Sequence, residues 1–227
     1  MTRSLGADKE VGAVQRLIGG ALLVLSLGWP PQTMASKTEN ADQVPVISVS
    51  IHDQAEVPEQ TLRQAQRTAT RLFEHAGIRL EWTECTPNPA GTSVEQLCSD
   101  AKYPQHLHLS IVSRSRGLTA ATIGISFLSP GGEGCYADIF YEPVLELQGM
   151  EKQDLGSMLG HAAAHELGHL LLGTNSHSVQ GLMRARWEGP ELLQIHNRTL
   201  YFSEGQARRM RETLAAQRGS SHQLLGK

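Results

Sequence analysis

The sequence of 227 residues predicts an α+β fold, in which a mixed, twisted sheet packs against a long buried helix and a C-terminal helix. Three observations predict this class. Several short segments alternate apolar and polar residues with the period of a half-buried strand. Two of these segments flank an amphipathic helical segment, an order typical of a crossover between parallel strands. Residues 155–172 have a helical pattern and are apolar on nearly every side, which predicts a buried helix.

The predicted elements follow one another without internal repeats, so we expect one domain over residues 45–218. A polar tail, residues 36–44, precedes this domain, and a flexible tail, residues 219–227, follows it. The first predicted helix begins near Pro58, a favoured early helical residue, and ends at Gly77, a common C-terminal stop. The predicted strands cover residues 46–51, 78–82, 106–112, 121–128 and 136–141, and the last predicted helix follows Ser203, a candidate N-cap.

The composition excludes several classes of protein. Twenty Lys and Arg against 23 Asp and Glu give a net charge of -3, which argues against nucleic-acid partners and a polybasic membrane surface. With 40% hydrophobic and 19% charged residues the chain is globular rather than disordered. Three cysteines exclude a four-cysteine metal site within one chain. The ten histidines all lie beyond residue 50, and histidine is the commonest metal ligand.

The first 35 residues predict a signal peptide. Arg3, Lys9 and Arg16 precede an apolar run over residues 17–29. That run is shorter than the roughly 20 apolar residues that span a bilayer. A small-residue site fits cleavage near Ala35, and an uncleaved N-terminal anchor is the alternative. We therefore expect a secreted or periplasmic protein with no stable membrane insertion after cleavage.

Export also affects the cysteines, because an oxidising compartment favours disulfides. Cys85 and Cys98 bracket a loop rich in Pro, Asn, Gly and Thr, and a bridge between them would close it. Cys135 would then be left over, although its pairing with either of the others stays open at this point.

Two histidines lie on one face of the predicted strand 106–112. His106 and His108 alternate with Leu107 and Leu109, and in principle they could form a metal pair. We interpret them as solvent-facing residues, since alternation of this kind is what a half-buried strand shows.

The motif that indicates chemistry lies in the apolar helix, where His165-Glu166-Leu167-Gly168-His169 has the pattern HExxH. Residues four apart lie on the same face of a helix, so both imidazoles can reach one ion. Glu166 lies on the flank of that face, where it can accept a proton from a water that zinc activates. The pattern predicts a Zn²⁺ site with His165 and His169 as ligands and Glu166 as the catalytic general base.

The third ligand is less directly indicated. Gly173 ends the helix, and His177 follows four residues later, close enough to return to the ion. Asn175, Glu188 and Glu191 remain alternatives. His161 continues the row of histidines, but three in a row span about 12 Å at 1.5 Å per residue, too far for one zinc ion.

These residues resemble the metzincin clan of zinc metallopeptidases, whose pattern HExxHxxGxxH precedes a methionine turn. Here the segment is HELGHLLLGTNSH, so the glycine and the last histidine each come later than in the clan. In strict register Asn175 would be the third ligand, whereas a one-residue shift at each step gives His177. Met183 would correspond to the turn methionine. The chain is also similar to secreted bacterial zincin-like proteins that share HExGHLLLG and a Gly-Leu-Met turn.

The resemblance implies a zincin-like fold with one catalytic Zn²⁺ and His165, His169 and His177 as its ligands. The expected function is a secreted zinc peptidase, an endopeptidase rather than an exopeptidase, acting on peptide or protein substrates. Residues 119–128 are the expected edge strand that pairs with substrate. Two alternatives stay open: a non-catalytic binding module with a structural zinc, and an amidase acting on cell-wall peptides. The sequence indicates no oligomeric state.

Overall fold

The computed structural model describes residues 44–85, 98, 102–114, 122–151 and 153–224. The predicted signal peptide, its cleavage site and most of the polar tail lie outside these residues. None of the helices in the described ranges is both long enough and apolar enough to cross a membrane.

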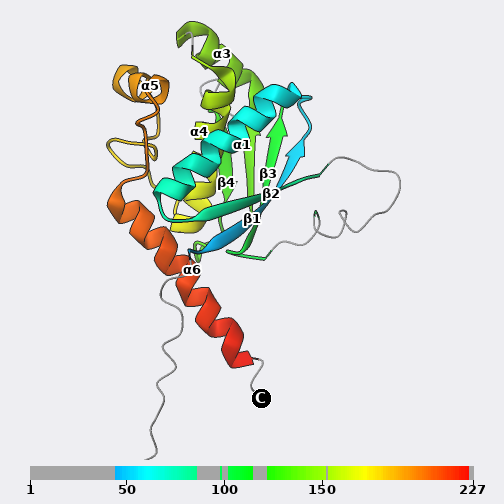
Figure 1. The fold of residues 1–227 in the computed structure, drawn as a ribbon, viewed down its shortest axis with the longest axis vertical. Helices are drawn as coiled ribbons and strands as arrows, with labels where there is room; N and C mark the ends of the chain where they lie inside the picture. Colours follow the sequence, from blue (N-terminus) through cyan, green and yellow to red (C-terminus); the bar gives the residue numbers. More distant parts are fainter. Residues whose placement is uncertain (1–43, 86–97, 99–101, 115–121, 152, 225–227) are drawn as a thin grey trace, which may run out of the picture. The chain divides into compact units, whose positions relative to one another are not determined.

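The sheet has five strands in the order β2-β1-β3-β5-β4 (Figure 1). Three of its four strand pairings are parallel. The fourth, between β4 and β5 at one edge, is antiparallel. Strand β1 and strand β2 flank helix α1 in the chain and pair in parallel, which confirms the predicted crossover. The strands are β1 (Val46–Asp53), β2 (Arg79–Glu84), β3 (His106–Val112), β4 (Gly124–Phe127) and β5 (Tyr136–Phe140).

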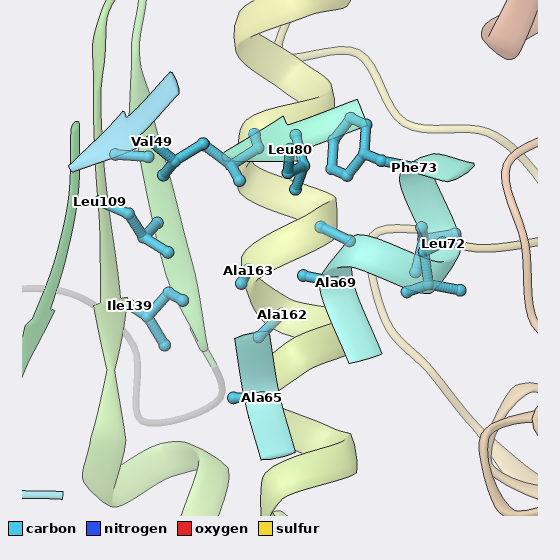
Figure 2. Packing of buried hydrophobic residues seen from close by; sticks show 14 of the residues in the cluster. Val49, Ala65, Ala69, Leu72, Phe73, Leu80, Leu109, Ile139, Ala162 and Ala163 are labelled. Carbon is cyan, nitrogen blue, oxygen red and sulfur yellow. The ribbon is translucent and has the colours of Figure 1, made fainter. Parts of the chain in front are cut away.

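Helices α1 (Glu59–His75) and α4 (Leu155–Leu172) pack on one face of this sheet. The register places Val49 beside Leu107 and Leu109 beside Ala137, so the apolar members of each alternating strand share a face. Figure 2 shows Leu109 and Ile139 of the sheet pointing toward the small residues of the two helices, among them Ala65, Ala162 and Ala163. The expected α+β architecture, with a mixed sheet, a buried helix carrying HExxH and a C-terminal helix, is confirmed.

Helices α1 and α4 approach closely because α4 has glycine where they cross. A Cβ atom on Gly156 would lie 2.5 Å from the side chain of Gln64. One on Gly160 would lie 2.5 Å from both the carbonyl oxygen of Ala65 and Cβ of Thr68. The two glycines therefore set how near α4 lies to α1, and α4 carries the predicted site.

Two helices were not expected from the sequence. Helix α3 (Tyr141–Glu151) follows β5 directly and carries Pro143 in its first turn, and its apolar residues do not form one stripe. Helix α5 (Gly189–His196) carries Pro190 as its second residue, and a Gly-Pro pair in a sequence suggests the interruption of a long helix. Proline is tolerated in the first turn of a helix, and Glu188 and Glu191 form a capping box there.

Helix α6 (Glu204–Leu224) begins one residue after the predicted N-cap and is longer than expected. It continues past residue 218, where we had placed the start of a flexible tail. Propagation of an existing helix costs little, and it continues here through Gly219 and two serines.

Cys85 and Cys98 form a disulfide, with their Cα atoms 5.7 Å apart, and Cys135 is a free, half-buried thiol. The predicted pairing is confirmed.

We expect Gly160→Ala to lower the free energy of unfolding by about 1–3 kcal/mol, because the new methyl group meets a backbone carbonyl that cannot move without separating the helices. Equilibrium denaturation in urea measures this change.

Gly149→Ala is the matched control, since a Cβ on Gly149 of α3 would meet nothing within 4 Å. That change should be neutral or stabilise by up to about 1 kcal/mol through helix propensity. Equal effects of the two substitutions would contradict the close packing of α1 on α4.

Candidate metal centre

Helix α4 presents the HExxH motif from the interior of the domain. The Asp154 carboxylate caps its start by accepting a hydrogen bond from the Ser157 backbone N–H at 2.7 Å. Gly173 ends it in the left-handed conformation at φ 65°, and its N–H donates to the His169 carbonyl at 3.0 Å. Apart from Leu155 and Ser157, every residue of the helix is buried. A polar side chain on this helix is therefore costly unless it finds a partner.

Three histidines converge at one end of this helix. The Nε2 atoms of His165 and His169 are 3.0 Å apart. One nitrogen each of His165, His169 and His177 lies within 4.8 Å of the others. Nitrogens that share a zinc ion at about 2.0–2.1 Å can be at most about 4.2 Å apart, so an ion would draw the three slightly closer.

Backbone carbonyls fix the tautomers of the two buried rings. His165 Nδ1–H donates to the Leu182 carbonyl at 2.8 Å, and His169 Nδ1–H donates to the Thr174 carbonyl at 2.7 Å. A carbonyl can only accept, so in each neutral ring the proton is on Nδ1 and Nε2 keeps its lone pair. Two acceptors then face each other at 3.0 Å, an arrangement that a shared cation relieves. The donor set therefore fits a divalent metal that prefers imidazole, as Zn²⁺ does.

The electrostatics keep these rings in the neutral form that a metal binds. Burial, followed by the neighbouring His169, lowers the pKa of His165 to about 3. Burial also lowers the pKa of His169 and of His177. Because only a neutral imidazole is a ligand, near pH 7 no proton has to leave before an ion enters.

Glu166 directly follows His165 in α4 and is 4% exposed. The Ser126 hydroxyl lies 2.7 Å from Glu166 Oε2 and 2.8 Å from the Glu166 carbonyl oxygen, and it can donate to either. Burial raises the pKa of Glu166 to about 7, although the hydrogen bond from Ser126 opposes the shift. A divalent cation at the adjacent histidines would lower that pKa again.

Edge strand β4 holds this carboxylate in place through two residues that the sequence did not single out. Gly124 and Ser126 are two apart and therefore on one face of the strand. A Cβ on Gly124 would lie 2.7 Å from both Cγ and Oε1 of Glu166, so only glycine leaves room. The only signal in the sequence was their alternate position in the predicted strand.

Met183, the expected turn methionine, is buried next to Gly168, which lies between His165 and His169 in the chain. It is 1% exposed, and a Cβ on Gly168 would lie 2.9 Å from its sulfur. The neighbouring Leu182 carbonyl accepts hydrogen bonds from both His165 and the Trp187 indole, the latter at 3.1 Å. The turn at 181–183 thus supports the His165 ring directly.

The alternative ligands lie elsewhere. Glu188 and Glu191 accept charged hydrogen bonds from Arg184, at 2.8 and 2.5 Å, and cap helix α5. Asn175 is exposed on the loop that leads to His177. His161 is fully buried, and its Nδ1–H donates to the Ser157 carbonyl at 2.7 Å, which makes it a packing residue. Within the described residues, His165, His169 and His177 are the one group of three convergent ligands.

A second set of histidines lies on the sheet face away from α1 and α4. His108 is 3% exposed, so our interpretation of this residue as solvent-facing is wrong. Its ring stacks on those of His106 and Tyr136, at centroid distances of 5.0 and 4.9 Å. His108 Nδ1 is 3.3 Å from His52 Nε2, and the two rings are inclined by only 24°. His52 and His108 can therefore share one hydrogen bond between nearly parallel rings. The rings of His165 and His169, by contrast, are inclined by 79°.

A cavity of about 420 Å³ opens beside the candidate metal centre. His165, Glu166 and His177 face it from one side, and residues 122–124, which lead into β4, face it from another. Helix α3 and residues 184–187 complete its walls. A substrate in this cavity would therefore lie between the motif and the edge of the sheet.

Comparison with known proteins gives structural likeness only. No protein-family model and no curated protein matches the chain. The zinc-dependent peptidase of Methanocorpusculum labreanum is 15% identical over 71% of this chain and 99% of its own, with a TM-score of 0.46. Archaemetzincin of Methanopyrus kandleri is 16% identical over 74% and 96%, with a TM-score of 0.47. Metalloproteinase-II of Bacteroides fragilis is 14% identical over 75% and 53%, with a TM-score of 0.46.

We expect His177→Ala to weaken Zn²⁺ binding by at least about 100-fold, since loss of a direct ligand should exceed the roughly 10–100-fold that loss of a supporting hydrogen bond costs. Competition with a chromophoric chelator measures the affinity. Asn175→Ala is the matched control on the same exposed loop and should leave the affinity unchanged. Weakened binding in Asn175→Ala together with normal binding in His177→Ala would restore the strict spacing of the clan.

Proposed function

We propose that the chain is a zinc-dependent endopeptidase that hydrolyses peptide bonds with His165, His169 and His177 as ligands and Glu166 as general base. One observation carries the proposal: the buried carboxylate of Glu166 lines the same cavity as His165, whose Nε2 faces that of His169 at 3.0 Å. A purely structural metal site has no need of that carboxylate, whose burial is costly.

When bound, Zn²⁺ would supply a Lewis acid that polarises the scissile carbonyl and acidifies the attacking water. Glu166 would accept the proton of that water and deliver it to the leaving amine. Ser126 holds one carboxylate oxygen, at 2.7 Å, while the missing side chain of Gly124 leaves space beside the other. The Ser126 hydroxyl and the small Gly124 of β4 would thus orient the base.

The substrate would bind as an extended strand. Strand β4 is the last in the sheet order, and among the described strands it pairs with β5 alone, so its outer edge can offer hydrogen bonds to a peptide. Pairing of this kind holds a substrate by its main chain, and cavities beside the strand select side chains. The position of β4 next to Glu166 favours a peptide bond as the reacting group.

The proposed site of action is outside the cytoplasm. Residues 1–35 have the pattern of a signal peptide, and the Cys85–Cys98 bridge suits an oxidising compartment.

Glu166→Gln should lower kcat by roughly 10²–10⁴-fold, because the amide cannot accept a proton from the attacking water. Zinc content should stay the same, since the three histidines are unchanged. Mass-spectrometric detection of cleavage in a random peptide library, with metal analysis of the same samples, measures both quantities.

Glu74→Gln serves as the control for Glu166→Gln, because Glu74 is an exposed glutamate of α1. Full activity of Glu166→Gln would refute the general-base mechanism. Cleavage of cell-wall peptides but of no protein-derived peptide would favour the amidase instead. A zinc-loaded wild-type chain that cleaves neither would favour the binding module.

Gly124→Ala should lower the rate roughly 100-fold while zinc binding is kept, because a displacement of about 1 Å at a catalytic group has effects of that size. The added methyl group would force the Glu166 carboxylate away from its position 2.7 Å from the Gly124 Cβ site. Gly189→Ala, where the new Cβ meets nothing within 4 Å, is the control. An active Gly124→Ala would show that β4 does not set the position of the base.

A further inference from the structure

A second cavity, of about 730 Å³, lies away from the candidate metal centre and shares no residue with the first. Helix α1, the start of α4 and the end of α5 form its walls. Three arginines line it: Arg67 and Arg71 from α1, and Arg198 just beyond α5. Asp154 is the one acidic residue in the lining, so the charged side chains leave a net positive charge.

The three arginines have no carboxylate partner among the described residues. Five other arginines in this part of the chain do pair with a glutamate, namely Arg63, Arg79, Arg114, Arg184 and Arg208. Arg67 donates only to the Gln64 side-chain amide oxygen, at 2.7 Å. Asp154 is engaged at the start of α4, where its Oδ1 accepts from the Ser157 N–H. Three like charges that share one concavity with a single counter-charge repel one another, and an anionic ligand reduces that repulsion.

Arg71 is held in a fixed orientation. Its Nη1 donates to the Arg198 carbonyl at 3.0 Å and to the Tyr201 hydroxyl at 3.1 Å. The guanidinium also lies over the Tyr201 ring, 5.6 Å from its centroid. Only Nη1 is occupied by these contacts, so the remaining N–H groups of the planar fork can serve a ligand.

Arg198 shows backbone strain at the same place. Its φ is 60°, in the left-handed region that favours glycine, although an arginine occupies the position. This conformation turns the chain after α5 and presents the Arg198 carbonyl to Arg71. The strained residue and the oriented one are therefore joined by a hydrogen bond at the wall of the cavity.

We propose that this cavity binds a phosphate group. Arginine forks match the geometry of phosphate oxygens and form paired, charge-assisted hydrogen bonds with them. A volume of about 730 Å³ exceeds that of inorganic phosphate and suits a phosphomonoester on a small carrier. The site is independent of the proposed peptidase activity.

The test is isothermal titration of the zinc-loaded chain with glycerol 3-phosphate, inorganic phosphate and succinate. We expect saturable binding of the phosphomonoester, weaker binding of inorganic phosphate and none of succinate. The double variant Arg67→Gln Arg198→Gln should lose at least about 10-fold in affinity, because it removes two charged donors. Arg209→Gln, an exposed arginine of α6 outside the cavity, should bind as the wild type does.

Asp154→Asn provides a test in the opposite direction. Asparagine caps a helix as well as aspartate does, but it removes the one negative charge that faces the ligand. Affinity should therefore rise by about 2- to 5-fold, and added salt should weaken binding in every variant. Equal binding of succinate, unchanged binding by the double variant, or weaker binding by a folded Asp154→Asn would each overturn the proposal. If the double variant still binds phosphate as the wild type does, the phosphate binds at the zinc ion instead.

Discussion

The Nε2 atoms of His165 and His169 on helix α4 can only accept hydrogen bonds, and they face each other at 3.0 Å. Much of the domain supports this contact. The arrangement exists because the carbonyls of Leu182 and Thr174 accept hydrogen bonds from the Nδ1–H groups of His165 and His169. Both carbonyls belong to the segment that follows α4, so the course of that segment fixes the rings. It begins at Gly173, whose left-handed conformation turns the chain back toward the helix. The buried Met183 then packs against Gly168, which lies between His165 and His169 in the chain.

The same constraint reaches the sheet through packing. Gly156 and Gly160 let α1 lie directly against α4, and the small residues between the helices and the strands keep the layers close (Figure 2). At that separation β4 meets α4, so that Ser126 bonds to Glu166. Gly124 leaves room for the same carboxylate. The hydrophobic core therefore determines the geometry of the candidate metal centre, because a shift of α4 would move Glu166 away from Ser126 and Gly124.

Sequence patterns predicted the parts of the fold that repeat regularly. The strand 106–112 and the helix 155–172 have the predicted bounds, since the strand alternates over its whole length and the helix is a continuous apolar segment that ends at Gly173. Helix α5 was missed because Gly189-Pro190 suggested an interruption, whereas the proline lies in its first turn. Helix α3 was missed because its apolar residues form no single stripe. His108 was misplaced for a related reason: alternation distinguishes the two faces of a strand but does not say whether the polar face is covered.

The candidate metal centre was predictable as far as spacing along one helix determines contact. His165, Glu166 and His169 follow from four-residue periodicity, and His177 from its short distance along the chain. Gly124 and Ser126 were not predictable, because about forty residues separate them from Glu166 and only the sheet topology brings them together. The cavity lined by Arg67, Arg71 and Arg198 is of the same kind, since its residues come from distant elements.

X-ray absorption at the zinc edge of the purified, zinc-loaded chain tests the central claim most directly. The facing lone pairs of His165 and His169, completed by His177, predict a first shell of three nitrogens at about 2.0–2.1 Å with outer-ring scattering typical of imidazole. A remaining light-atom position would belong to water. A shell with a sulfur ligand at about 2.3 Å, or one with fewer than two imidazoles, would contradict the account, because the metal would then not occupy the gap that the tautomers create.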